Sequence, residues 1–171
     1  EISEKLESAG ARLSFFNGQA RVGFSGKFLS EDTNMVVGLL ADQLQNPLFA
    51  EEELEKAKKR QIAGYKRSKE STRGNAMNNM LQAFYGSDHQ NSPTNPDQAI
   101  EDIKTLTPES LKAYHSENYG TGSMVLVVVG DVDHNEMESL IKESFRGWKQ
   151  SPLKNKEEKG LGTKASGKVY V

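Results

Sequence analysis

The sequence predicts an α+β fold, a two-layer α/β sandwich in which helices cover one face of a mixed sheet. Three observations predict it. Two runs with alternating apolar residues stand near the start of the chain, an unbroken apolar run stands at residues 124–129, and the segments between them have helical periodicity. The 171 residues are the length of one ordinary domain. We therefore expect strands early and late in the chain, with helices between them.

Composition narrows the classes of function. Hydrophobic residues make up 35% of the chain and charged residues 27%, with a net charge of -2, so we expect a globular protein without a general attraction to nucleic acid or anionic membranes. The chain has no cysteine, which excludes disulfides and thiolate zinc ligands and leaves periplasm and cytoplasm equally open. No apolar run approaches the roughly 18 residues of a spanning helix, so membrane insertion is not expected.

The first elements are a helix end and a hairpin. Residues 2–8 have the apolar spacing of a helix, with Gly10 as its stop. Two alternating runs follow, and the Asn-Gly pair between them is the strongest short-range signal of a hairpin. We expect strands at about 11–16 and 19–28. Because the chain starts within this first helix, we expect it to be a fragment of a longer polypeptide.

Helices fill the centre of the chain. Ser30 is expected to cap a helix that ends at Asn46-Pro47, because Glu31 and Asp32 suit the positive end of its dipole. The next helices are expected at about 51–69, 76–85 and 98–104, with another starting at Pro108 after the N-cap Thr107. The expected features along them are a break at "STRGN", an apolar stripe of Met77, Met80, Leu81 and Phe84, and a buried side marked by Leu111, Tyr114 and Tyr119.

The late elements are a strand, a helix and a linker. Met124 to Val129 is expected to be a buried strand, because its Val and Leu content is unbroken. Asp133 and Glu136 resemble a capping box for the helix that follows. Residues 151–167 are polar and rich in Lys and Gly, as in an interdomain linker. The last four residues, "KVYV", are expected to start the first strand of a following domain, so we assign one domain to 1–150 and the remainder to 151–171.

Candidate catalytic residues are few. The three histidines are His89, His115 and His134, and none has another four residues away, so no helix offers two imidazoles on one face. We expect surface or helix-end histidines. The carboxylates Glu51, Glu52 and Glu53 fall in a first helical turn, where they offset the helix dipole.

The rest of that helix has the pattern of a solvated charged face. Glu52 with Lys56, and Glu55 with Lys59, are spaced as i,i+4 ion pairs. The basic run "KKRQIAGYKR" contains one aromatic residue, which argues against nucleic-acid binding. From the residues alone, the chain is an α+β domain without a visible active site.

Four segments, read in order, resemble the pitrilysin/insulinase family of zinc metallopeptidases. They are "LESAGARLSFF", "VVGLLADQLQNPLFAEEELEKAKKRQIAGYKRS", "AFYGSDHQNSP" and "AIEDIKTLTPESLKAYHSENYGTGSMVLVVVGDVDHNEMESLIKESFRGW". Each segment is weak alone, but their order and spacing are fairly specific, and together they cover about residues 1–150. The resemblance implies the LuxS/processing-peptidase-like metallohydrolase fold, with an N-terminal strand and helix that would precede Glu1.

The resemblance also implies where a zinc site would be. Active members carry H-x-x-E-H, whose histidines bind zinc and whose Glu is the general base, and that motif would fall before Glu1. The third ligand is a Glu, and the matching segment here is "RQIAGYK", which places Gly64 at the ligand position and Ala57 at the position of an assisting Glu. A glycine offers no donor, so the resemblance implies no catalytic residue and no metal ligand in this chain. A shifted alignment would use Glu70 or Glu55 instead, although Glu70 lies about a turn and a half further along the helix.

This missing ligand matches the family's non-catalytic halves. The resemblance implies a domain of such a half, which completes the peptide-binding chamber against a zinc-containing catalytic half of the same chain or a partner subunit. The family's substrate-contacting residues lie in a later domain and have no counterpart here. The alternative is a structural or assembly subunit without peptidase activity, like the core proteins of the bc1 complex.

Overall fold

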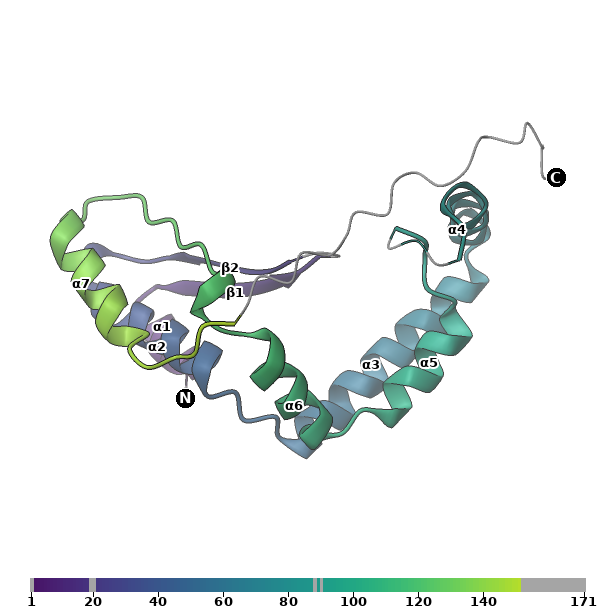
Figure 1. The fold of residues 1–171 in the computed structure, drawn as a ribbon, viewed down its shortest axis with the longest axis horizontal. Coiled ribbons are helices and arrows are strands. Elements are labelled where there is room, and N and C mark those ends of the chain that lie inside the picture. The colour runs from purple at the N-terminus through teal and green to yellow at the C-terminus, as the bar shows by residue number, and fades with distance from the viewer. Residues whose placement is uncertain (1, 19–20, 88, 90, 152–171) are drawn as a thin grey trace. The chain divides into compact units, whose positions relative to one another are not determined.

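The computed structural model describes residues 2–18, 21–87, 89 and 91–151 (Figure 1). These residues form two compact units, the first built from 2–48 and 115–151 and the second from 49–114. The elements in chain order are α1 (Ile2–Ser8), β1 (Arg12–Asn17), β2 (Val22–Lys27), the 3₁₀ helix η1 (Ser30–Asp32), α2 (Thr33–Gln45), α3 (Glu51–Glu70), α4 (Thr72–Tyr85), α5 (Pro96–Thr105), α6 (Pro108–Asn118), the 3₁₀ helix η2 (Thr121–Ser123) and α7 (His134–Ser144). The α+β class is confirmed.

The predicted hairpin is present in the first unit. β1 and β2 pair antiparallel, with Leu13 opposite Gly26 and Phe15 opposite Phe24. This register places Leu13, Phe15 and Phe24 on one face, and the rings of Phe15 and Phe24 lie 6.4 Å apart between centroids. The alternation read from the sequence therefore identified the apolar face.

Gly10 ends α1 as expected. Its φ of +61° lies in the left-handed region that glycine adopts without steric cost. The amide of Ala11 then reaches back to the carbonyl of Leu6 at 2.8 Å, and the chain turns directly into β1.

The core of the first unit lies between α2 and α7. The buried residues of α2 are Val36, Val37, Leu40 and Ala41. Met137 of α7 and Phe145, which directly follows α7, are also buried. Gln45 connects the two helices, because its Nε2 donates to the carbonyl of Ser144 at 2.9 Å. The spacing of these residues places them on one side of each helix.

The expected role of Ser30 is wrong. Its side chain does not cap α2, which starts three residues later after a 3₁₀ turn and has Asp32 as its N-cap residue. The Ser30 hydroxyl instead donates to the carbonyl of Asp131 at 3.0 Å. The hydroxyl is thus bound to a carbonyl that is distant in the sequence, and it makes no local capping bond to α2.

In the second unit α3 packs against α5 (Figure 1). Ala99 and Ile100 of α5 are buried, and Lys69 Nζ of α3 lies 2.6 Å from Asp97 Oδ1. Asn95 caps α5, because its side chain accepts from the amides of Asp97 and Gln98. α6 starts at Pro108 after the predicted cap Thr107, whose Oγ1 accepts from the amide of Ser110 at 3.1 Å.

The expected break at "STRGN" is present at Ser71, where α3 ends, but α4 starts at Thr72 and not at about residue 76, because Ser71 Oγ accepts from the amide of Gly74. Two expectations for these helices fail. Three of the four residues in the predicted α4 stripe remain exposed: Met77, Met80 and Phe84. Tyr114 of α6 is also exposed.

The segment from Met124 to Val129 is not a strand. Among the described residues the sheet has two strands, β1 and β2, so the predicted mixed sheet does not form there. The reason is that a strand needs a partner for its backbone N–H and C=O groups, and no described strand lies beside this segment in register. The predicted linker and the "KVYV" strand at 168–171 lie outside the described residues. Within the described part of the chain, no helix combines the length and the apolar character needed to cross a membrane.

Candidate functional site

The carboxylates at the start of α3 have structural roles. Glu51, Glu52 and Glu53 occupy its first turn, and Lys56 Nζ lies 2.8 Å from Glu52 and 2.9 Å from Glu53. The hydrogen bond from Lys56 holds the pKa of the Glu53 carboxyl below its ordinary value. The carboxylate oxygens of Glu52 and Glu53 therefore already bind the ammonium group of Lys56. A Glu four residues before a Lys is the favoured order for an ion pair on a helix surface.

The second expected ion pair on α3 is different from the prediction. Glu55 pairs with Lys58 at 2.8 Å, one turn along at i,i+3, and not with Lys59. The Lys58 side chain is 12% exposed and the Glu55 side chain 50% exposed. Glu55 is therefore committed to a local ion pair.

Gly64, the position at which the resemblance places a zinc ligand, lies in the interior of α3. Apart from its chain neighbours and the backbone of its own helix, a Cβ at this position would meet no atom within 4 Å. Packing therefore does not require a glycine here, although a glycine in a helix interior costs roughly 0.5–1 kcal/mol relative to alanine. The position has room for a side chain and provides no donor.

A zinc ion does not fit the described residues. Catalytic zinc uses three protein ligands, and no group of three His, Asp or Glu side chains in the described part of the chain is arranged to hold a metal. Ala57, at the position of the assisting Glu, has no polar side-chain atom. Glu70, the alternative ligand, is the exposed last residue of α3.

The histidines have separate local contacts. His89 is buried in the second unit and stacks on Tyr85, with 4.7 Å between ring centroids. Its Nδ1 accepts from the amide of Asn91 at 3.1 Å. These contacts are those of a structural histidine in the loop before α5.

The other two histidines belong to the first unit. His115 Nε2 lies 2.8 Å from the carbonyl of Leu44, so this nitrogen carries the proton. The His115 ring stacks on Tyr119, with 4.8 Å between centroids. His134 is the first residue of α7, as its position after the cap Asp133 predicts.

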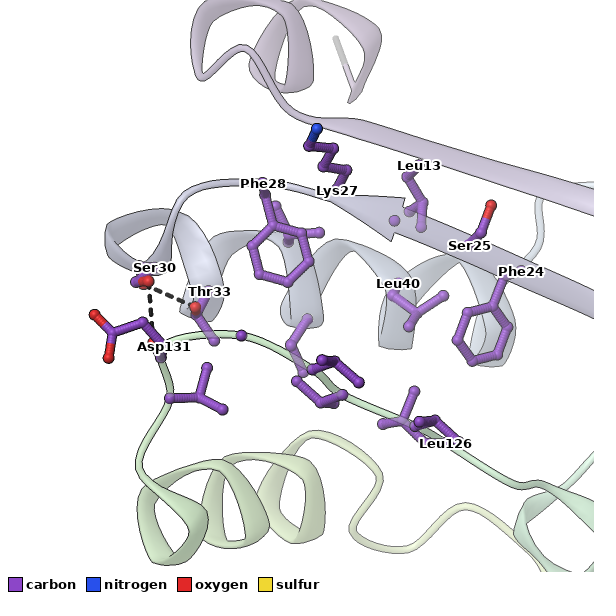
Figure 2. Close-up of a pocket in the computed structure, with 18 residues that line it drawn as sticks. Leu13, Phe24, Ser25, Lys27, Phe28, Ser30, Thr33, Leu40, Leu126 and Asp131 are labelled. Atoms are coloured by element: carbon purple, nitrogen blue, oxygen red, sulfur yellow. Dashed lines mark hydrogen bonds between the residues drawn. The ribbon is translucent and has the colours of Figure 1, made fainter.

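Sequence reasoning missed an apolar cleft in the first unit (Figure 2). Its volume is about 270 Å³. Its walls are β2, the apolar stripe of α2 and the backbone from Leu126 to Val132. The sequence carries a signal for this cleft, because it contains three apolar faces, on β2, α2 and residues 124–129, and all three border the same space.

Comparison with known proteins identifies the family. The sequence model described as "Insulinase (Peptidase family M16)" matches residues 1–97, more than half of the chain. The chain belongs to the insulinase family. A second model, described as "Peptidase M16 inactive domain", matches residues 105–171 of this M16 chain.

Relatives of this M16 chain include proteases and assembly subunits. A protein of Rickettsia felis described as an uncharacterized zinc protease is 26% identical over 157 residues, which are 91% of this chain and 37% of that protein. Mitochondrial-processing peptidase subunit beta of Dictyostelium discoideum is 27% identical, with coverages of 89% and 32%. Cytochrome b-c1 complex subunit 1 of Bos taurus is 27% identical, with coverages of 85% and 30%. The chain thus spans about a third of the length of these relatives.

A solved structure supports the fold. The crystal structure of a peptidase M16 inactive domain from Pseudomonas fluorescens superimposes with a TM-score of 0.77 at 22% identity, covering 88% of this M16 chain and 37% of that one. At this identity the likeness shows the fold alone.

Proposed function

We propose that this chain is a non-catalytic part of a longer zinc-dependent M16 endopeptidase, in which it forms part of the substrate chamber and of the interface with the catalytic half. The observation that carries the proposal is Gly64, which stands on α3 where the family's zinc-binding carboxylate is expected and offers no donor. The match of residues 105–171 to the inactive-domain model supports the same assignment.

In this proposal the zinc ion belongs to the catalytic half, either elsewhere in the same polypeptide or in a partner subunit, and the substrate is a peptide. No catalytic step is assigned to a residue of this chain. Its contribution is to binding and closure, so changes here should affect KM more than kcat where substrate release is fast.

The test uses the full-length protein, the polypeptide that contains these 171 residues. Zinc content is measured by elemental analysis, and activity by cleavage of a quenched-fluorescent peptide. We expect Glu55→Gln and Glu70→Gln to leave the zinc content and kcat unchanged, with Glu51→Gln as the matched control on the same helix. Loss of one zinc equivalent in either of the first two variants, but not in the control, would refute the proposal.

A second candidate is a structural or assembly subunit without peptidase activity. The similarity to bovine cytochrome b-c1 complex subunit 1 favours it. The same measurements separate the two functions. A full-length protein that contains no zinc, cleaves no peptide with any co-purifying partner and yet remains in a stable assembly is the scaffold, whereas chelator-sensitive cleavage by the protein or its partner identifies the peptidase.

A further inference from the structure

The middle of α3 carries a positive charge that its own acidic residues do not balance. Between Glu55 and Glu70 the sequence has seven lysines and arginines and no acidic residue. Three of the seven are bound by carboxylates: Lys56, Lys58 and Lys69. The other four are exposed and make no ion pair with any described residue; we call them the cationic face, and they are Lys59, Arg60, Lys66 and Arg67.

The lysines of the cationic face lack a carboxylate for identifiable reasons. Glu55 lies four residues before Lys59, the favoured spacing for an ion pair, but Glu55 is bound to Lys58 instead. Glu70 lies four residues after Lys66, which is the less favourable order of charges on a helix, and the described residues include no ion pair between them. The helix surface therefore does not neutralise these two ammonium groups.

The two arginines have even fewer local partners. One turn before and after Arg60 the sequence offers a lysine, two alanines and a glycine. Like charges that share a helix face repel each other. A carboxylate supplied from outside α3 would relieve this repulsion and would bind the guanidinium groups through paired N–H···O bonds.

A gap in the row of long side chains divides the cationic face. Its first pair of cations precedes the second by seven residues, which is about 10.5 Å along the helix axis. Ala63 and Gly64 lie midway, within one turn of both arginines. Apart from its chain neighbours and the backbone of its own helix, a Cβ on Gly64 would meet no atom within 4 Å. A side chain that enters this gap is thus flanked by cations on both sides.

We propose that the cationic face binds an acidic stretch of the peptide substrate, with one carboxylate of the peptide in the gap at Ala63 and Gly64, between Arg60 and Arg67. This inference rests on the proposed function, which supplies a peptide as the substrate, and it names the class of peptide: one rich in Asp and Glu. The four side chains bind and orient the peptide, and they take no part in its cleavage.

Nucleic acid is the other polyanion that would match these charges, but the rest of the helix does not suit it. Proteins bind single strands by stacking the bases on aromatic side chains that lie beside the cations. The one aromatic residue of α3 is Tyr65, which is half-buried on the other side of the helix together with Leu54 and Ile62. An acidic peptide needs only the charges, so the observations favour a peptide.

The first test measures binding to the full-length protein in the presence of a chelator, so that no peptide is cleaved. The probes are two short fluorescent peptides that differ only in their central residues, glutamate in one and glutamine in the other, and anisotropy gives their Kd values. We expect Arg60→Gln with Arg67→Gln to weaken binding of the glutamate peptide about tenfold and to leave binding of the glutamine peptide unchanged.

The matched control is Arg73→Gln with Lys112→Gln, which removes the same charge from exposed residues of the same unit. We expect this control to bind both peptides as the unchanged protein does. If the arginine variant binds the glutamate peptide as tightly as the unchanged protein does, or if the control loses as much affinity, the proposal is overturned.

The second test fills the gap from within the chain. Gly64→Glu places a carboxylate between the two arginines without removing either, whereas Gly64→Gln places an uncharged group of the same size there. We expect Gly64→Glu to weaken binding of the glutamate peptide about tenfold and Gly64→Gln to have a much smaller effect. Equal weakening by both variants would mean that the volume of the side chain blocks the peptide, and would overturn the proposal.

Further outcomes separate this inference from the proposed function. Preference for the glutamate peptide in a full-length protein that has no zinc and cleaves nothing with any partner would support the acidic ligand and refute the proposed function. Chelator-sensitive cleavage without that preference would do the reverse. Stronger competition by single-stranded DNA than by unlabelled glutamate peptide would overturn the inference in favour of nucleic acid. Self-association that the arginine variant abolishes would overturn it in favour of a second copy of the protein.

Discussion

Gly120 lies directly against the backbone of Lys149: a Cβ on Gly120 would come within 2.4 Å of the Lys149 carbonyl oxygen. The next amide, that of Thr121, donates to the same oxygen at 3.0 Å. Gly120 is buried, and its φ of 163° is extended backbone that any residue adopts. The requirement for glycine here comes from the close approach of two chain segments, the one before η2 and the one after α7.

We expect Gly120→Ala to destabilise the first unit by about 1–3 kcal/mol, the usual cost of forcing extra volume into a packed site. Backbone cannot move aside as a flexible side chain can, so the Thr121–Lys149 hydrogen bond should lengthen or break. Urea denaturation measures the change. The matched control is Gly38→Ala in α2, where a Cβ meets nothing within 4 Å. A Gly120→Ala protein as stable as the control would contradict the prediction.

Gly64 gives the opposite prediction. Because the site is open and lies inside α3, Gly64→Ala should raise the free energy of unfolding by roughly 0.5–1 kcal/mol. Gly64→Glu should also fold, since its carboxylate has room. Thermal unfolding of the three proteins checks this, and a lowered stability of Gly64→Ala would show that the glycine is required for packing.

How much of this fold could be predicted depends on the range of the interactions. The end of α1 at Gly10 and the cap of α7 at Asp133 involve consecutive residues, whose chemistry is visible in the sequence. The hydroxyl of Ser30 finds its acceptor on Asp131, 101 residues later, and no local pattern indicates that bond. The failed strand at residues 124–129 has the same cause, because a strand is defined by a partner that its own sequence does not specify.

The candidate site was predictable only in part. The charged start of α3 has a local pattern, so its structural role and the pairing of Glu52 with Lys56 followed from the spacing. The choice of Lys58 over Lys59 by Glu55 did not, since i,i+3 and i,i+4 partners are nearly equivalent on a helix. Gly64 leaves no chemical pattern at all, because an absent side chain can be recognised only against relatives that have one.

Asp133 should contribute measurably to the stability of α7. Its Oδ1 accepts from the amides of Asn135 at 2.8 Å and Glu136 at 2.9 Å, two of the donors that a helix N-terminus leaves unpaired. We expect Asp133→Ala to lower the free energy of unfolding by about 1 kcal/mol. Asp133→Asn keeps an acceptor oxygen and is the control. If both variants lose the same stability, the charge of Asp133 and not its capping bonds is responsible.

Lys56 should set the titration of Glu53. The hydrogen bond that Lys56 donates lowers the pKa of Glu53, and the bonds that Lys56 donates to Glu52 and Glu53 raise the pKa of Lys56 itself. The stabilisation linked to Glu53 is fully present above the ordinary glutamate pKa of about 4.3, and it is lost as the pH falls through the lowered pKa of Glu53. The stabilisation linked to Lys56 is fully present below the ordinary lysine pKa of about 10.4, and it is lost as the pH rises through the raised pKa of Lys56.

Lys56→Gln should therefore return the pKa of Glu53 upward toward its ordinary value. Carbon-detected NMR titration of the Glu53 carboxyl measures it. Lys59→Gln changes the same charge on the same helix without touching Glu53, and is the matched control. Because both partners are exposed, the effect should shrink as salt is added. A Glu53 pKa that moves equally in both variants would mean that the general charge of α3, and not the Lys56 contact, lowers it.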